Sequence, residues 1–149
     1  MRVVVQRVTE ASVTINGETI SAINEGLLLL IGIRHSDSEN EIDRITRKIV
    51  TLRIFDDERG VMNRSVQDIG GSILAVSQFT LYGNCKKGNR PSYIDAAPVA
   101  VSEPLYDTFC DRLEQLLPGK IQRGRFGADM KVQLLNNGPV TILMDSNNL

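Results

Sequence analysis

The run from Leu27 to Ile33 is apolar apart from Gly32, and it limits the possible folds of this chain more than any other segment. It has seven residues, whereas a helix that spans a membrane needs about 20. A run this short, with apolar residues on both faces, is typical of a strand that is covered on both sides. We therefore expect a central, buried strand here and no membrane segment.

Apolar residues that alternate with polar ones predict further strands, each with one buried face. Residues 2–8 are rich in Val. The alternating positions are Ala11, Val13, Ile15, Met130, Val132, Leu134, Val140, Ile142 and Met144. Asn16-Gly17 predicts a hairpin turn, because both central residues of a type I′ turn need a positive φ. The plain interpretation of residues 136–139 (Asn-Asn-Gly-Pro) is a second hairpin with a trans proline, since X–Pro bonds are cis only about 5–6 % of the time.

Two helices are predicted. The first begins after Ser38, which stands three residues before Glu41 and so fits a capping box. The second is expected to begin near Ser102, with Pro104 in its first turn, and to end at Pro118-Gly119. The buried stripes of the two helices are Ile42, Ile45, Ile49 and Leu52, and then Leu105, Phe109, Leu113, Leu116 and Leu117.

A chain of 149 residues buries about 68–70 % of its unfolded surface when it folds, which favours one domain with one sizeable core. The predicted strands and helices indicate an α+β fold. We expect a mostly antiparallel, barrel-like sheet with two main helices, as a single domain over residues 1–149.

The cysteine and histidine counts exclude several classes of site. Two cysteines, Cys85 and Cys110, cannot staple a domain of this size, and with His35 they fall short of the four ligands of a structural zinc site. No metal or cofactor is expected. His35 is the only imidazole and stands at a strand end, which favours an exposed side chain over a general base. Arg7 follows Met1 too closely for a signal-peptide core, so a reducing, cytoplasmic setting is expected.

The net charge of −1 conceals two basic segments. Residues 84–93 hold Lys86, Lys87 and Arg90 with no acid. Residues 120–131 hold Lys120, Arg123, Arg125 and Lys131 against Asp129. Two basic segments on an otherwise acidic chain indicate a local anion site, and the alternative is that each is a solvated face.

One further segment gathers groups with chemical potential. Ser77-Gln78-Phe79-Thr80 ends an apolar strand just before the first basic segment, and such a cluster can bind a nucleoside through an aromatic wall and polar edges. The alternative is an ordinary strand end. Cys85 beside Lys86 can form a reactive thiolate, but no base or orienting partner is evident in the sequence.

Together these segments resemble the D-aminoacyl-tRNA deacylases over essentially the whole chain. The matching motifs are Arg2–Ile15 with Gln6-Arg7-Val8 and Ala11-Ser12-Val13, then Ser77–Tyr82, Lys86–Ser92, Gly124–Met130 and Asn136–Thr141. The resemblance implies a homodimeric, cytoplasmic carboxylic ester hydrolase without a cofactor. Its substrate would be the 3′ aminoacyl end of tRNA, cut at the ester of a D-amino acid, and glycyl-tRNA is expected to be cut as well.

The resemblance also implies roles for particular residues. A cis Gly138-Pro139 bond would reach the other subunit's site and reject L-amino acids through main-chain carbonyls, with Arg7 holding that turn. Ser77, Gln78, Phe79 and Thr80 would line the pocket, with the N–H groups of Phe79 and Thr80 placed for the oxyanion. Phe126 and Met130 would lie near the adenosine, and the tRNA phosphates would meet Lys86, Lys87, Arg90, Arg123 and Arg125.

Asn137 departs from the family pattern, in which an acid often precedes the Gly-Pro, and any role that needs a negative charge there is in doubt. Three alternatives remain open. The chain could be a non-catalytic, nucleic-acid-binding dimer of the same fold, a cysteine hydrolase built on Cys85, or a trans-Pro relative with another chiral preference.

Overall fold

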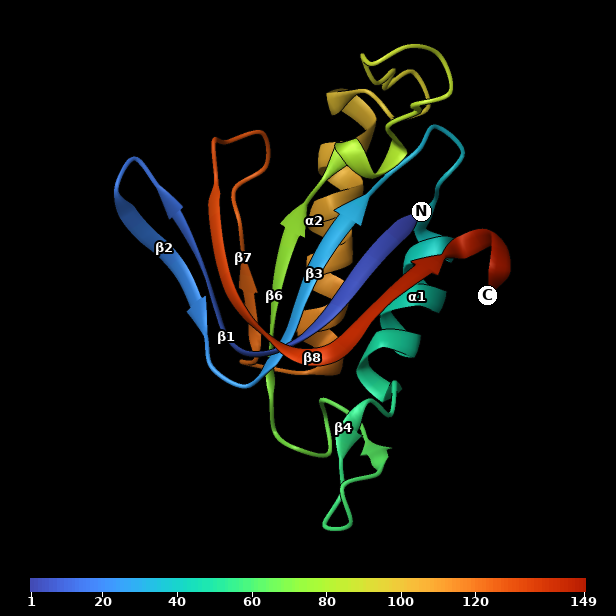
Figure 1. The fold of residues 1–149 in the computed structure, drawn as a ribbon. Helices are drawn as coiled ribbons and strands as arrows, with labels where there is room; N and C mark the ends of the chain where they lie inside the picture. Colours follow the sequence, from blue (N-terminus) through green and yellow to red (C-terminus); the bar gives the residue numbers. More distant parts are fainter.

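Strand β3 (Gly26–Gly32) is the predicted central strand, and the computed structural model, which describes residues 1–149, places it inside a six-stranded sheet (Figure 1). It pairs with β1 (Arg2–Ile15) in antiparallel and with β6 (Ser72–Ser77) in parallel fashion. Leu27 and Leu29 contribute to the core beneath the helices, and Leu28 to a smaller core on the opposite face. Both faces of β3 are therefore covered, as its apolar run predicts.

The fourteen-residue strand β1 is paired on both edges. Strand β8 (Lys131–Asp145) follows it along one edge, while β3 and then β2 (Glu18–Ile23) share the other. Strand β7 (Ile121–Arg123) adds to β6 in parallel. The sheet is thus mostly antiparallel, curved and barrel-like, with a parallel part in β3, β6 and β7, and the predicted fold class is confirmed. A two-stranded hairpin of β4 (Phe55–Asp56) and β5 (Met62–Arg64) projects from it.

The two Asn-Gly signals have different outcomes. Asn16 and Gly17 have φ of 50° and 78°, and the predicted hairpin joins β1 to β2. The second hairpin is wrong, because residues 131–145 form one strand whose two halves pair with the same edge of β1. The ladder is irregular between Gln6 and Glu10, opposite the Gly138-Pro139 bond, which is cis. Proline cannot donate to a ladder, so the sequence fits an interruption within a strand as well as a turn.

Helix α1 (Glu39–Thr51) has the predicted capping box, in which Ser38 accepts from the Asn40 N–H and the Glu41 carboxylate accepts from the Ser38 N–H at 2.8 Å. Helix α2 (Val99–Leu116) begins three residues before the predicted Ser102. Pro104 therefore lies in the helix interior, where its missing N–H leaves the carbonyl of exposed Ala100 to solvent. Neither helix is long and apolar enough to cross a membrane.

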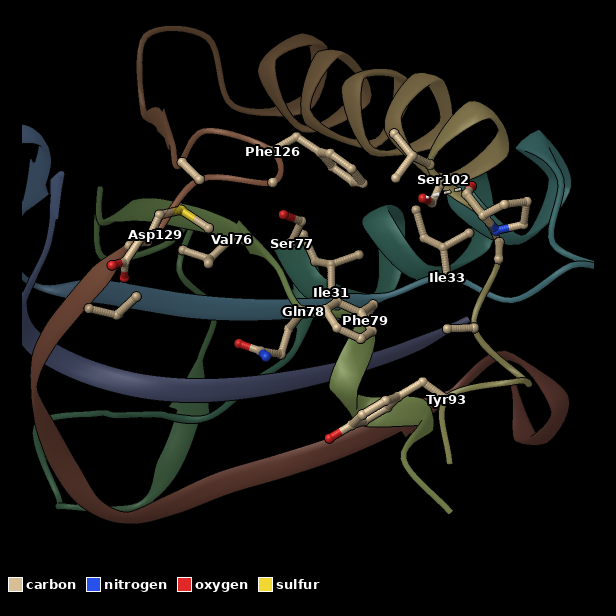
Figure 2. A pocket seen from close by; sticks show the side chains of 18 residues that line it. Ile31, Ile33, Val76, Ser77, Gln78, Phe79, Tyr93, Ser102, Phe126 and Asp129 are labelled. Carbon is tan, nitrogen blue, oxygen red and sulfur yellow. Dashed lines mark hydrogen bonds between the residues drawn. The ribbon is translucent and has the colours of Figure 1, made fainter. Parts of the chain in front are cut away.

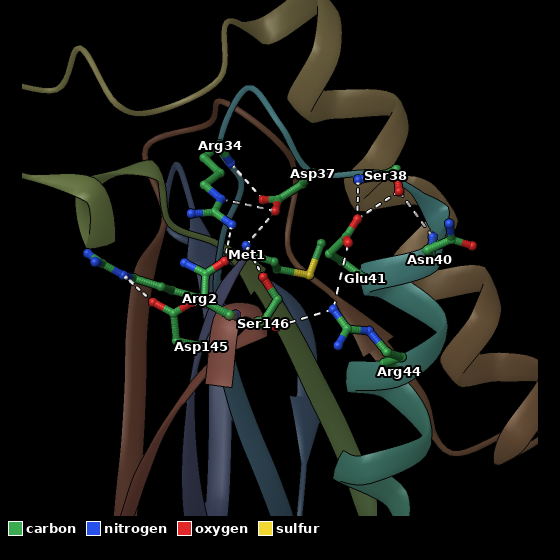
Figure 3. Close-up of polar contacts among 11 residues, drawn as sticks. Met1, Arg2, Arg34, Asp37, Ser38, Asn40, Glu41, Arg44, Asp145 and Ser146 are labelled. Atoms are coloured by element: carbon green, nitrogen blue, oxygen red, sulfur yellow. Dashed lines mark hydrogen bonds and ion pairs between the residues drawn. The ribbon is translucent and has the colours of Figure 1, made fainter. Parts of the chain in front are cut away.

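The two ends of the chain meet at one end of the sheet (Figure 3). The Met1 ammonium group lies 2.5 Å from Asp37 and donates to Ser146 at 2.8 Å, and all of these groups are buried. The short 3₁₀ helix η2 (Ser146–Asn148) follows β8 at this point. Burial lowers the pKa of the Met1 ammonium, against the opposing effect of the Asp37 carboxylate.

We predict that Ser38→Ala lowers the free energy of unfolding by about 1 kcal/mol, because the Asn40 N–H loses its acceptor. The hydrogen bond from Ser38 holds the pKa of Glu41 below its usual 4.5, so the carboxylate stabilises the protein at neutral pH and less as the pH falls through that pKa. Urea denaturation of Glu41→Gln should show a deficit that shrinks between about pH 7 and about pH 3. Exposed Ser36→Ala serves as the control, and a deficit independent of pH would contradict the assignment.

Candidate functional site

A cavity of about 660 Å³ opens where β6 ends, between the first turn of α2 and the loop that leads into β8 (Figure 2). It is lined mainly by apolar side chains. The polar groups in its wall come from Ser77, Gln78, Ser102 and Asp129. Its shape and lining are those expected of a small-molecule or nucleoside site.

The wall formed by residues 124–130 is held by the carbonyl of Ala75 in β6. That carbonyl accepts from the Tyr106 hydroxyl at 2.8 Å and from the Gly124 N–H at 2.9 Å. The Tyr106 ring packs against Phe126, with their centroids 5.9 Å apart. A carbonyl oxygen has two lone pairs, so one buried atom connects β6, α2 and the loop that carries Phe126.

Met130 lies against the start of the same loop. Its sulfur accepts from the Arg125 N–H at 3.4 Å, and a Cβ built on Gly124 would come within 2.6 Å of it. Only glycine leaves room for the thioether at this position. Phe126 and Met130 thus reach the cavity from one loop, as predicted from the sequence.

The opposite wall begins with the strand end Ser77-Gln78 and continues into η1 (Phe79–Tyr82), a 3₁₀ helix. The Gln78 side chain donates to the Thr80 hydroxyl. The N–H groups of Phe79 and Thr80 open the helix and have no acceptor within the chain, whereas the Leu81 N–H donates to the Gln78 carbonyl at 3.3 Å. Two unpaired donors therefore lie at the edge of the cavity that Gln78 and Phe79 line.

Arg2 fixes η1 from the side of the N-terminus. It donates to the Leu81 carbonyl at 3.0 Å and to Asp145 at 3.1 Å, and its guanidinium lies 4.8 Å from the centre of the Tyr82 ring. Burial raises the pKa of Tyr82 to about 12. The sequence offers no signal for this contact, because Arg2 and Leu81 are 79 residues apart.

The basic residues divide into free and engaged side chains. Lys86, Lys87 and Arg90 are exposed on the loop between η1 and α2, and Arg125 is exposed beside the opposite wall. Both segments thus adjoin the cavity. Arg123 differs, because it lies 2.6 Å from Asp111 of α2 and already has a carboxylate partner.

Gly138 and Pro139 lie away from this cavity within one chain. Arg7 pairs with Leu27 and Leu27 with Ile73, whereas Ser77 pairs with Ile31. The segment beside Arg7 is therefore about 13 Å from Ser77 along the strands, and β1 and β3 also separate the two. Gly138 and Pro139 are exposed and line no part of the cavity.

Arg7 holds the Gly138 segment from below. Its buried guanidinium donates to the Asn137 carbonyl at 3.0 Å and lies 3.5 Å from the Gly138 carbonyl. It also donates to the Ile54 carbonyl at 2.7 Å and to Asp56 at 3.2 Å. The side chain of Asn137 makes no hydrogen bond in these contacts, so the segment is fixed through its backbone.

The remaining candidates lie where the sequence predicts. His35 is exposed, with its Nε2 3.3 Å from the Ile94 carbonyl oxygen, and Cys85 is exposed on the basic loop. Cys110 is buried, and burial raises the pKa of its thiol to about 11. No group of three or more His, Cys, Asp and Glu side chains is close enough together to hold a metal ion.

Comparison with known families completes this description. The model of the family described as D-Tyr-tRNA(Tyr) deacylase matches residues 4–145. The chain belongs to the D-Tyr-tRNA(Tyr) deacylase family. The resemblance stated from five motifs is thereby confirmed.

Relatives within the deacylase family are similar over their whole length. A D-aminoacyl-tRNA deacylase of Bacteroides thetaiotaomicron is 59 % identical over 148 residues, and one of Flavobacterium johnsoniae is 56 % identical over 148 residues. Each comparison covers 99 % of this chain and 99 % of the relative.

Two solved structures are also similar. One, described as a c-Myc DNA unwinding element binding protein, has a TM-score of 0.92 and 46 % identity, and the match covers 97 % of this chain and 98 % of that one. Another, described as a probable eukaryotic D-amino acid tRNA deacylase, has a TM-score of 0.82 at 17 % identity over 96 % of this chain and 97 % of that one, and shows a shared fold.

Sequence reasoning about this deacylase-family chain missed three site residues, namely Arg2, Tyr93 and Tyr106. Arg2 and Tyr106 act through backbone carbonyls of distant strands, which no local pattern reveals. Tyr93 lies at the end of the predicted irregular loop and lines the cavity. An aromatic residue that directly follows a basic loop is a signal that could have found it.

Proposed function

We propose that this chain hydrolyses the ester between a D-amino acid and the 3′-terminal adenosine of tRNA, and so belongs to translation quality control. The carrying observation is a cavity with free N–H donors at one edge and basic segments beside it, in a chain of the D-Tyr-tRNA(Tyr) deacylase family. We assign the activity to one domain over residues 1–149. The substrate implies a cytoplasmic enzyme.

Phe126 and Met130 form the wall for the adenosine. A flat aromatic ring and a polarisable thioether suit the face of a base, and both side chains are held by bonds to Ala75 and Arg125. Ser77 and Gln78 offer hydroxyl and amide groups to the ribose and the ester. The phosphates that precede the adenosine meet exposed Lys86, Lys87, Arg90 and Arg125, with Arg123 as a weaker candidate because of Asp111.

The chemistry asks little of side chains. An aminoacyl ester on a ribose is already activated, and the neighbouring ribose hydroxyl assists the attack of water on the carbonyl carbon. Negative charge then develops on the carbonyl oxygen, where the N–H groups of Phe79 and Thr80 stabilise it. Breakdown returns the electron pair to the ribose oxygen, which takes a proton as the free D-amino acid departs.

Chiral selection rests on Gly138 and Pro139. Since this segment lies far from the cavity of its own chain, a second copy must supply it, and we propose a homodimer with each site at the subunit interface. Main-chain carbonyls that face the α-hydrogen of a D residue collide with the side chain of an L residue. Arg7 keeps the segment rigid, and each 1.36 kcal/mol of collision gives about tenfold discrimination. Glycine has no side chain to reject, so glycyl-tRNA is also a substrate.

Asn137 fits this backbone role. Its carbonyl accepts from Arg7 at 3.0 Å, and that contact needs no acidic side chain.

The activity is tested by release of amino acid from D-tyrosyl-tRNA by the purified protein with EDTA present. We expect hydrolysis of D-tyrosyl-tRNA and glycyl-tRNA and sparing of L-tyrosyl-tRNA by at least about a hundredfold. A similar structure described as a DNA unwinding element binding protein favours a second candidate, a non-catalytic nucleic-acid-binding dimer. That candidate would bind the tRNA without releasing tyrosine. Cys85→Ser, assayed in parallel, should keep full activity.

We predict that Thr80→Ala retains single-turnover hydrolysis, because the proposed contribution of Thr80 is its N–H and not its hydroxyl. The Gln78 side chain loses its acceptor, so a loss of about tenfold or less is expected. Rapid-quench measurement at saturating enzyme gives the rate. Complete loss of activity in a variant with an unchanged melting temperature would show that the hydroxyl is essential.

Charge reversal of the basic loop should weaken binding of every tRNA species. We predict that Lys86→Glu with Lys87→Glu flattens the slope of log affinity against log salt by about 0.7 for each lost phosphate contact. Lys48→Glu, an exposed change on α1 away from the cavity, is the matched control. Equal slopes for the three proteins would identify the loop as a solvated surface.

A further inference from the structure

Tyr93 and Phe79 form an aromatic pair at the mouth of the cavity that the proposed function leaves without a role. Their ring centroids are 5.2 Å apart with an interplanar angle of 73°, an edge-to-face contact. Tyr93 is 40 % exposed and Phe79 is 56 % exposed. Figure 2 shows the pair on the side of the cavity away from Phe126. Aromatic rings this exposed are unusual unless they bind something.

The Tyr93 ring is held in place rather than loose. A Cβ built on Gly83 would lie 3.2 Å from its ring, so the ring packs directly on the backbone at Gly83. Just before Tyr93, Asn84 and Ser92 exchange two backbone hydrogen bonds of 2.8 and 2.9 Å. These bonds close the base of the loop 85–91, and the Lys86 N–H donates to the Asn84 side chain at 3.0 Å. Loop and ring therefore form one ordered unit.

The charge of this loop identifies the partner. Lys86, Lys87 and Arg90 are exposed at its tip, with no acidic residue among positions 84–93. A cationic loop directly beside exposed aromatic rings is the arrangement by which proteins hold single-stranded nucleic acid, with bases stacked on rings and phosphates on cations. A protein partner would not require the uniform positive charge.

We propose that Tyr93 and Phe79 form a stacking subsite for the base of the nucleotide that precedes the terminal adenosine, whose phosphate meets the loop 85–91. This inference rests on the proposed function and extends it. The adenosine is bound by Phe126 and Met130, and the preceding base stacks across the Tyr93 and Phe79 pair. Stacking does not read base edges, so the subsite tolerates any base.

The test compares two substrates, D-tyrosyl-tRNA and D-tyrosyl-adenosine, which lacks the preceding nucleotide. We expect Tyr93→Ala to lower the ratio of kcat/KM for the tRNA to that for the adenosine ester about tenfold, through KM. Tyr93→Phe should keep the ratio of the wild type, and Tyr93→Leu should lose it while preserving packing on Gly83. Ile94→Ala, a neighbouring change at a 78 % exposed residue outside the cavity lining, is the control.

Two results would overturn the subsite. An equal loss on both substrates would assign Tyr93 to the amino acid or the adenosine, and an unchanged ratio in both Tyr93→Ala and Tyr93→Leu would show that no base stacks there. Failure of the wild type to hydrolyse either ester is a different result, since it would overturn the proposed function and the subsite together.

Discussion

The pairing of β1 along both of its edges is the constraint on which the rest of the structure depends. Its backbone is hydrogen-bonded to β8 on one side and to β3 and then β2 on the other. Since successive side chains of a strand point to opposite faces, this pairing fixes which residues enter each core. It also sets the buried Arg7 beside the carbonyls of Asn137 and Gly138. The segment proposed to select chirality is thus built into the central ladder.

The cavity depends on the parallel side of the sheet. Strand β6 ends in Ser77 and passes into η1, while its Ala75 carbonyl binds both Tyr106 of α2 and the start of the Phe126 loop. Parallel neighbours need long crossovers, and α1 and α2 provide them between β3, β6 and β7. The crossover helix α2 therefore brings the two walls of the cavity against one strand end.

Much of the local structure could be predicted because local patterns determine it. The apolar run of β3, the Asn16-Gly17 turn and the capping box of α1 each follow from a few neighbouring residues. The start of α2 was missed because Pro104 is tolerated inside the helix, where solvent accepts the free carbonyl. The apparent second hairpin was wrong because a Gly-Pro interruption looks the same in a turn and in an irregular strand.

The sequence by itself determined the strand faces, the helix cap, the basic segments and the family likeness, because these depend on residue type and short-range period. Only the tertiary structure decided that Arg7 holds Asn137, that Arg2 holds η1 and that Tyr93 faces Phe79 at the cavity mouth. The Arg7 and Arg2 contacts join residues 130 and 79 positions apart. Such contacts arise from the competition of all strands for pairing and burial, which no local pattern encodes.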